Sequence, residues 1–154
     1  MKQSAGILAY RMKDEVQVFL VHPGGPFFTN KDAGSWTIPK GEFTEDEEPL
    51  TAAQREFLEE TGHQLSGDFL QLKSVKQKGG KVVHAWAVEQ EIDELEIRSN
   101  SFEIEWPPKS KKFKSFPEVD KAGWFSVEEA KAKINPAQIP LIDELRSLTA
   151  GKYH

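Results

Sequence analysis

Cysteine is absent from this sequence of 154 residues. Its absence excludes a disulfide framework, a thiolate nucleophile and a zinc–thiolate site. Long apolar runs are missing too, since the apolar stretch near the N-terminus, residues 5–10, is too short for a signal-peptide core or a membrane span. Repeats and low-complexity blocks are also lacking. We therefore expect a cytoplasmic protein with no membrane association.

Basic residues are fewer than acidic ones, with 20 Lys and Arg against 25 Asp and Glu. The formal net charge is −5 and the pI is about 5.4, whereas proteins that bind nucleic-acid backbones usually present a basic face. Stable nucleic-acid binding is therefore not expected. A hydrophobic fraction of 38%, with ten Phe and four Trp, is enough for one core. We predict a single domain over residues 1–154.

The most informative stretch is an acidic helix that ends at Gly62. Glu56, Glu59 and Glu60 lie on one helix face, because side chains at i, i+3 and i+4 are neighbours. Like charges at i,i+4 spacing cost roughly 0.2 to 0.5 kcal/mol per pair, a cost that a divalent cation would reverse. Mg²⁺ takes oxygen ligands and is commonly held by a few carboxylates together with substrate phosphate. The pattern indicates a metal site for a phosphorylated substrate.

The segment from Gly41 to His63 resembles the Nudix box, G-x5-E-x7-R-E-U-x-E-E-x-G-U, in which U is an aliphatic or bulky apolar residue. Only the last position departs, where His63 replaces an apolar residue. A match at so many fixed positions is far more specific than a lone glycine motif. The matching residues are Gly41, Glu47, Arg55, Glu56, Phe57, Glu59, Glu60 and Gly62. The flanking residues 36–40, 117–120 and 124–125 also look like the family.

The resemblance implies an α/β protein with the Nudix fold, a mixed β-sheet between helices in an α/β/α sandwich. It also implies hydrolysis of a nucleoside diphosphate linked to another group. It further implies that Glu56, Glu59 and Glu60 of this chain, with a backbone carbonyl at Gly41, hold Mg²⁺ or Mn²⁺. Such a cation neutralises phosphate oxygens and lowers the pKa of a bound water.

Many Nudix enzymes carry a further glutamate in a loop before a late strand, where it reaches the metals or the attacking water. Glu118 is the best match in this chain, and Glu103 and Glu105 are weaker competitors. Either Glu56 or Glu118 would take the proton of the water. The catalytic candidates implied by the resemblance are therefore Glu56, Glu59 and Glu118.

Two other expectations concern residues that do not take part in the chemistry. The family uses the glutamate at position 47 to pair with Arg55, which would fix the loop across the helix. His84 lies in a predicted strand, and we expect it to be packed or hydrogen-bonded, because the metal chemistry requires no imidazole. Both roles are structural.

Candidate substrate contacts lie outside the box, and each residue could instead be a solvated or packed side chain without a role in binding. Lys40 is either a phosphate contact or a solvated loop lysine. Lys78 and Lys81 lie in a Gly-Gly hairpin and form either a phosphate-facing rim or a solvated tip. Phe28 either stacks on a nucleobase or packs against the domain edge. The basic run 109–114 is either a surface loop or a lip that attracts an anionic substrate.

The substrate class is predicted from residues outside the box. The region 77–80 lacks the proline of ADP-ribose enzymes, while residues 36–41 look like the entry to the box in dinucleoside polyphosphate hydrolases. Lysine-rich segments on both sides favour several phosphates. We expect a small-molecule nucleotide substrate, either a nucleoside triphosphate or a dinucleoside polyphosphate. The alternatives are an ADP-ribose or nucleotide-sugar pyrophosphatase and a catalytically silent nucleotide-binding module.

Hydrophobic periodicity and turn residues predict the remaining elements. Pro49 suits the first position of the box helix, and Leu50, Ala53 and Phe57 form its buried stripe. A capping box at Ser126 opens a second helix. A last helix is expected from residue 140, with Leu141, Leu145 and Leu148 facing the sheet. Strands are expected at residues 4–10 and 16–21 as a hairpin, and at 36–38, 69–75, 82–88, 102–106 and 123–125.

Overall fold

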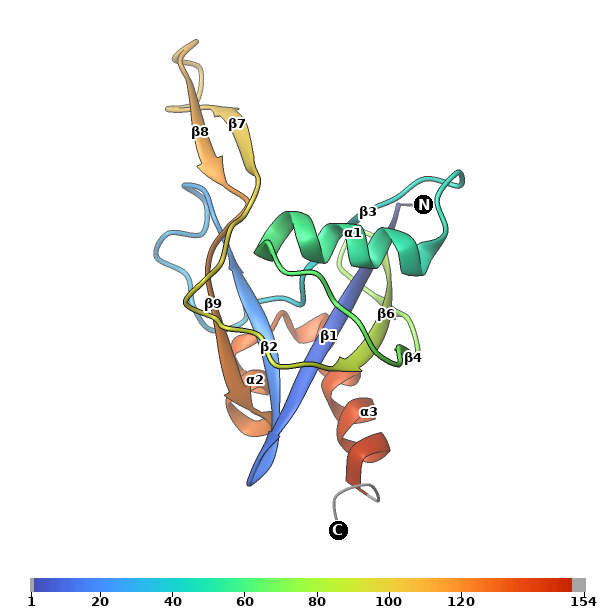
Figure 1. The fold of residues 1–154 in the computed structure, drawn as a ribbon. Helices are drawn as coiled ribbons and strands as arrows, with labels where there is room; N and C mark the ends of the chain where they lie inside the picture. Colours follow the sequence, from blue (N-terminus) through green and yellow to red (C-terminus); the bar gives the residue numbers. More distant parts are fainter. Residues whose placement is uncertain (1, 151–154) are drawn as a thin grey trace.

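A mixed β-sheet of seven strands lies at the centre of residues 2–150, the part of the chain that this computed structural model describes (Figure 1). Its strands are β1 (Gln3–Lys13), β2 (Glu15–Pro23), β3 (Lys40–Glu42), β4 (Leu70–Gln71), β5 (Val75–Lys76), β6 (Val82–Glu89) and β9 (Val119–Ser126). The main order is β4-β6-β1-β2-β9, with β3 paired to β1 and β5 to β6. Strands β1 and β6 run parallel and the other pairs antiparallel.

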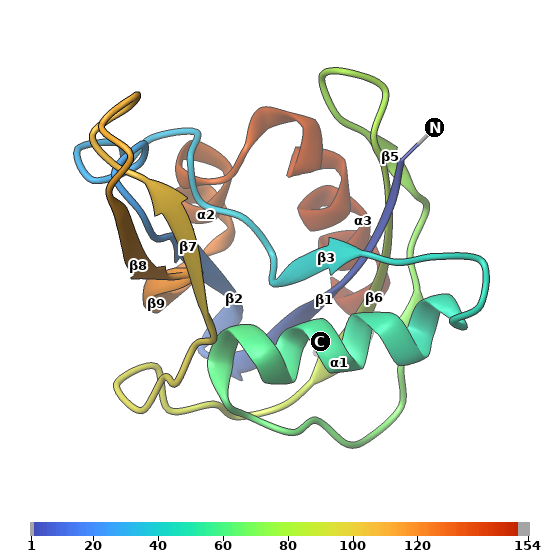
Figure 2. The same ribbon diagram turned by 90° about the horizontal axis from the view of Figure 1, so that it is seen from above.

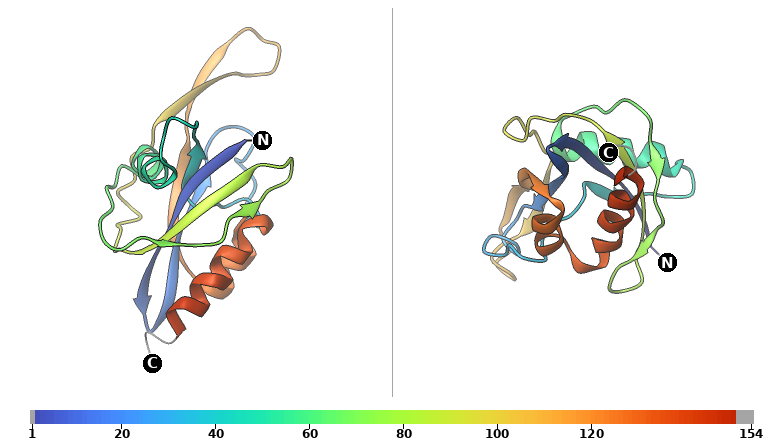
Figure 3. Two further views of the ribbon diagram at one scale, coloured as in Figure 1. Left: turned by 90° about the vertical axis from the view of Figure 1, so that its right-hand side faces the viewer. Right: turned by 90° about the horizontal axis from the view of Figure 1, so that it is seen from below.

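Helices cover both faces of this sheet. The helix α1 (Pro49–Thr61) lies on one face, and α2 (Val127–Lys133) and α3 (Ile139–Ala150) lie on the other, as the side view in Figure 3 shows. The α/β architecture expected from the sequence is therefore confirmed. None of the helices within residues 2–150 has the length and apolar character needed to cross a membrane.

The central strand β1 shows why the core has two layers. Alternate side chains of a strand point to opposite faces. Ala5, Ile7 and Ala9 therefore pack with α1, whereas Leu8 and Tyr10 pack with α2 and α3. Because both faces are covered, the strand is a nearly continuous apolar run. The predicted hairpin with β2 is present, and Asp14 makes the turn with a φ of 63°.

The box helix begins and ends where its sequence predicts. Pro49 occupies the first turn, and Gly62 ends the helix in the left-handed region with a φ of 78°. A Cβ on Gly62 would also lie 2.9 Å from the Cβ of Arg98, so glycine is needed there on two counts. Ala53 and Phe57 are fully buried under the helix, and Leu50 packs at the edge of the same cluster.

Of the predicted strands, one is absent from the structure and another is interrupted. Residues 36–38 form no strand, because Thr37 bridges Val21 while Trp36 bridges Ile134, so no continuous ladder forms. The predicted strand 69–75 is interrupted between β4 and β5. The backbone N–H of Lys73 leaves the ladder there and donates to the carboxylate of Glu144 on α3 (2.8 Å).

The C-terminal elements follow the prediction except at one leucine. Ser126 makes the predicted capping box at the start of α2. Leu141 and Leu145 of α3 are buried, but Leu148 is 48% exposed. Thr149 is buried in its place, and its hydroxyl donates to the carbonyl of Leu145 (3.0 Å).

A separate two-stranded arm projects from the body of the molecule (Figures 1 and 3). It consists of β7 (Ser101–Glu105) and β8 (Phe113–Pro117), which pair with each other and not with the central sheet. The predicted strand at 102–106 is thus present as β7, but it belongs to the arm and not to the central sheet. The basic run 109–114 forms the tip of this arm, where Glu105 accepts from the backbone N–H groups of Lys109 and Lys111.

Candidate active site

Helix α1, which carries the acidic face, lies directly against strand β3 (Figure 2). Backbone and carboxylate approach so closely that a Cβ on Gly41 would lie 2.0 Å from the Cδ of Glu56. Only glycine leaves room for this carboxylate, because it has no side chain beyond Cα. The residue order Lys40-Gly41 therefore brings a lysine and an open backbone segment to the glutamates of the helix.

Glu60 is the most buried of the three helix glutamates, with 8% of its surface exposed. The backbone N–H of Lys40 donates to its carboxylate, and the positive charge of Lys40 favours its ionised form. Burial outweighs both effects and, together with the negative charge of Glu56, raises the pKa of Glu60 to about 9. Conversely, burial and the charge of Lys81 lower the pKa of Lys40. Ionising Glu60 is therefore unfavourable in this setting, and a bound cation would favour its ionised form.

Glu118 reaches this acidic face from a distant part of the chain. Burial and the charges of Glu56 and Glu59 raise its pKa, and burial likewise raises the pKa of Glu56. Backbone hydrogen bonds fix its position: the N–H of Glu118 donates to Asn100 (2.8 Å), and the N–H of Asn100 donates to the carbonyl of Glu59 (2.7 Å). The base of the arm is therefore tied to the end of α1, which holds Glu118 beside the helix glutamates.

Arg55 connects the loop before α1 to the acidic face. Its Nε and Nη2 atoms donate to both carboxylate oxygens of Glu47, at 2.7 and 2.8 Å. Its Nη1 atom donates to Glu56 (2.9 Å) and to Glu59 (3.2 Å). The pairing with Glu47 was expected, whereas the contacts with Glu56 and Glu59 were not. Arg55 therefore orients two of the candidate ligands as well as the loop.

Two adjoining cavities open beside these groups. The first, which we call the Glu60 pocket, has a volume of about 260 Å³ and is lined by Val21, Pro23, Thr37, Lys40, Glu60, Glu118 and Val119. The second, the Gln138 pocket, has a volume of about 220 Å³ and is lined by Pro23, Phe28, Gly34, Ser35, Thr37, Lys40, Gln77, Asn135 and Gln138. Lys40 belongs to both. Together they fall in the range of about 300 to 1,000 Å³ that is typical of ligand sites.

The structure separates the predicted substrate residues. Lys40 and Phe28 line the pockets, and the amine of Lys31 lies 5.6 Å from the centre of the Phe28 ring. Lys81 lies near Lys40, with its Nζ 3.9 Å from Glu42. Lys78 is exposed at the hairpin and lines neither pocket.

The other side chains singled out in the sequence lie away from the acidic face. Glu105 is engaged at the tip of the arm, and Glu103 is exposed on β7. The imidazole of His84 hydrogen-bonds Gln3 (2.7 Å), as expected for a structural histidine. His63, at the one departing position of the box, hydrogen-bonds the carbonyl of Glu96 (2.8 Å).

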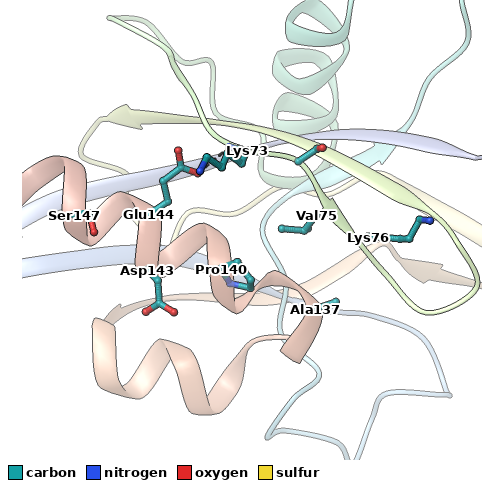
Figure 4. A pocket seen from close by; sticks show the side chains of 9 residues that line it. Lys73, Val75, Lys76, Ala137, Pro140, Asp143, Glu144 and Ser147 are labelled. Atoms are coloured by element: carbon teal, nitrogen blue, oxygen red, sulfur yellow. Dashed lines mark hydrogen bonds between the residues drawn. The ribbon is translucent and has the colours of Figure 1, made fainter.

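A larger cavity lies elsewhere. It has a volume of about 730 Å³ and is bordered by α3 and the segment around β5 (Figure 4). Lys73 and Lys76 line it together with Asp143 and Glu144, so its charges are mixed. None of the box carboxylates lines it. Its size therefore does not make it the site of the chemistry.

The donor set beside Glu60 suits a hard divalent cation, since it consists of carboxylate and carbonyl oxygens. Within residues 2–150, no three acidic or histidine side chains converge closely enough to form a ready-made cation cage. Arg55 accounts for part of this, because it holds Glu56 and Glu59 by hydrogen bonds.

The polar residues of the Gln138 pocket were not predicted from the sequence. Gln138 contacts Ile38 and Gln77, which are far from it along the chain. No local sequence pattern predicts the burial of Gln138, because a glutamine in a short turn between helices is ordinarily exposed. Only the folded arrangement shows that Gln77, Asn135 and Gln138 come together.

Comparison with known proteins gives one family and many similar folds. A family model described as NUDIX domain matches residues 1–145. No curated protein sequence gives a significant match. An Ap4A hydrolase from C. elegans, solved as a binary complex, is 20% identical with a TM-score of 0.69, covering 98% of this chain and 99% of that one.

Two further solved structures are similar over nearly the whole chain. The ORF135 protein of E. coli is 24% identical with a TM-score of 0.58, covering 99% of this chain and 95% of that one. The NUDIX domain of Shewanella oneidensis NrtR, solved with ADP ribose, is 14% identical with a TM-score of 0.61, covering 99% and 88%. At these identities the structures show a shared fold.

Proposed function

The chain belongs to the NUDIX domain family and is a Nudix pyrophosphohydrolase, and from this premise we propose that it uses a divalent cation to cleave nucleotides with several phosphates. The bond cleaved is a phosphoanhydride. The observation that supports the proposal is that Glu60 and Glu118 line one pocket together with Lys40, close enough to Glu56 for its charge to raise the pKa of both carboxyls. A purely structural acidic helix would have no use for a buried glutamate such as Glu60.

Glu56, Glu59 and Glu60, with the carbonyl of Gly41, are the groups that would hold Mg²⁺ or Mn²⁺. When bound, such a cation neutralises phosphate oxygens and lowers the pKa of a bound water. Arg55 donates hydrogen bonds to Glu56 and Glu59 and so orients these two carboxylates. Lys40 lines both pockets and would contact a phosphate that extends from one to the other.

The water that attacks phosphorus needs a proton acceptor. Glu56 is already hydrogen-bonded to Arg55, whereas Glu118 has no side-chain hydrogen bond within residues 2–150 and lines the Glu60 pocket. We therefore assign the proton transfer to Glu118. Its raised pKa makes it a stronger base than an ordinary carboxylate.

The substrate proposal rests on charge and on the two adjoining pockets. Lys81 lies close enough to Lys40 to lower its pKa, and Phe28 offers an aromatic ring in the Gln138 pocket. This arrangement favours a chain of phosphates that ends in a nucleoside. Nucleoside triphosphates or dinucleoside polyphosphates should be cleaved faster than ADP-ribose or nucleotide sugars.

A four-substrate panel tests this ranking. We would compare kcat/KM at fixed Mg²⁺ for a dinucleoside tetraphosphate, a nucleoside triphosphate, an oxidised purine triphosphate and ADP-ribose. ADP-ribose as the best substrate would overturn the ranking. Binding of nucleotides without cleavage of any would support the alternative of a catalytically silent binding module.

A further inference from the structure

The Gln138 pocket is bordered by a series of hydrogen bonds whose direction is fixed. The side chain of Gln138 is completely buried, and its Oε1 accepts from the backbone N–H of Ile38 (3.0 Å). A backbone N–H can only donate, so the oxygen of this amide must face it. The orientation of the Gln138 amide is therefore set by the main chain.

The amide group of Gln138 is fully used inside the protein. Its Nε2 donates to Thr37 Oγ1 (2.9 Å) and to Gln77 Oε1 (2.8 Å). Both hydrogens are thus engaged, and Gln138 has no donor left for a ligand. It acts instead on Gln77: because the oxygen of Gln77 faces Gln138, the NH₂ group of Gln77 is the end that remains.

That NH₂ group has no hydrogen-bond partner within residues 2–150, although Gln77 lines the pocket. Asn135 repeats the arrangement. Its Oδ1 accepts from the backbone N–H of Ala137 (3.0 Å), which leaves its NH₂ group without a partner in the same part of the chain. Two amide groups of fixed direction therefore offer donors at a pocket that also contains Phe28.

We propose that Gln77 is a specificity-determining residue, whose NH₂ group donates to an acceptor on the substrate's base, and that Gln138 is the residue that positions it. This inference rests on the proposed function, because the pocket adjoins the carboxylates through Lys40. Guanine and uracil present carbonyl oxygens where adenine and cytosine present amino groups. A pocket whose free groups are donors selects keto bases over amino bases.

The test compares matched nucleotides that differ in this group. The ratios of kcat/KM for GTP over ATP and for UTP over CTP should each be about threefold or more, the size of one net hydrogen bond. In Gln77→Glu, one carboxylate oxygen still accepts from Gln138 and the other presents an acceptor to the pocket. Both ratios should then fall to one or below.

Gln71→Glu is the matched control, since Gln71 is exposed on β4, lies outside both pockets and undergoes the same change of charge. It should keep the wild-type ratios. Gln77→Met, which removes the donor without adding charge, should bring both ratios close to one. Equal ratios in the wild type, or unchanged ratios in Gln77→Glu, would overturn the inference.

The same ratios are measurable without turnover. Dissociation constants of non-hydrolysable analogues of the four nucleotides, measured by calorimetry with Mg²⁺, should show the same preference and the same loss in Gln77→Glu. If the wild type cleaves no nucleotide but binds with this preference, the proposed function fails and the inference stands. If it cleaves all four equally and binds them equally, the inference fails and the proposed function stands.

Discussion

Glu60 combines the deepest burial among the helix glutamates with a pKa raised to about 9. Without a bound metal, the folded protein keeps Glu60 protonated up to about pH 9, whereas the unfolded chain ionises it near its ordinary pKa, so the raised pKa lowers the free energy of unfolding between these two values. Glu60→Gln removes this cost and should raise the free energy of unfolding without metal, at pH 8, by at least about 1 kcal/mol. Turnover with Mg²⁺ should fall by at least about 10²-fold.

Urea denaturation and a turnover assay measure the two effects of Glu60→Gln. The exposed Glu45 supplies the control, because Glu45→Gln removes the same charge from a solvated turn and should change neither quantity appreciably. Near-normal turnover of Glu60→Gln at saturating Mg²⁺ would show that Glu60 is not a metal ligand.

Glu118 provides a second prediction for a single residue. An interaction made mainly in the transition state affects the rate more than ground-state binding. Glu118→Gln should therefore lower kcat by at least about 10²-fold with little change in KM. Steady-state kinetics with Glu103→Gln as the control test this, since Glu103 is exposed on the arm. If Glu103→Gln proves as damaging, the assignment of the proton acceptor is wrong.

Between elements, the link that matters most is the ion pair of Glu47 with Arg55, which joins the loop to α1. Arg55→Ala leaves Glu47 without its two hydrogen bonds and frees Glu56 and Glu59. Because both partners are partly exposed, we expect a drop in Tm of only a few degrees, together with reduced turnover. An unchanged Tm would mean that the pair has no structural role.

The same pair gives a pH dependence. Hydrogen bonds from Arg55 lower the pKa of Glu47 below its ordinary value. A carboxyl with a lowered pKa in the folded state stabilises the protein above its ordinary pKa, and this contribution is lost as the pH falls through the lowered value. The difference in Tm between the wild type and Glu47→Gln should therefore be largest near neutral pH and shrink in acid. A difference that grows in acid would contradict the assignment.

Elements defined by local signals were predictable, and those defined by partners were not. Pro49 and Gly62 set the ends of α1 through their own backbone preferences. The break between β4 and β5 depends on Glu144 accepting from Lys73, a contact that joins a strand segment to a helix late in the chain. Nothing near Lys73 in the sequence signals that partner.

For the molecule as a whole, the box pattern predicted the glutamates of α1, whereas the residues that face them come together only through the fold. Glu118 was found because the family places a glutamate before a late strand, and the structure brings it to the acidic face. The Gln138 pocket escaped prediction, since its hydrogen bonds join Gln138 to Ile38 and to Gln77 across most of the chain. The direction of those bonds, on which base selection would depend, exists only in the folded state.

The most direct test of the account is the Mg²⁺ dependence of nucleotide cleavage in the wild type and in Glu59→Gln. Glu59 lies on the accessible face of α1, so its replacement by Gln should leave a folded protein. We predict cleavage of a nucleoside triphosphate or a dinucleoside tetraphosphate that stops when EDTA removes the metal and falls at least about 10²-fold in Glu59→Gln. Cleavage that persists in EDTA, or that proceeds equally well in Glu59→Gln, would contradict the assignment of these carboxylates as a catalytic metal site.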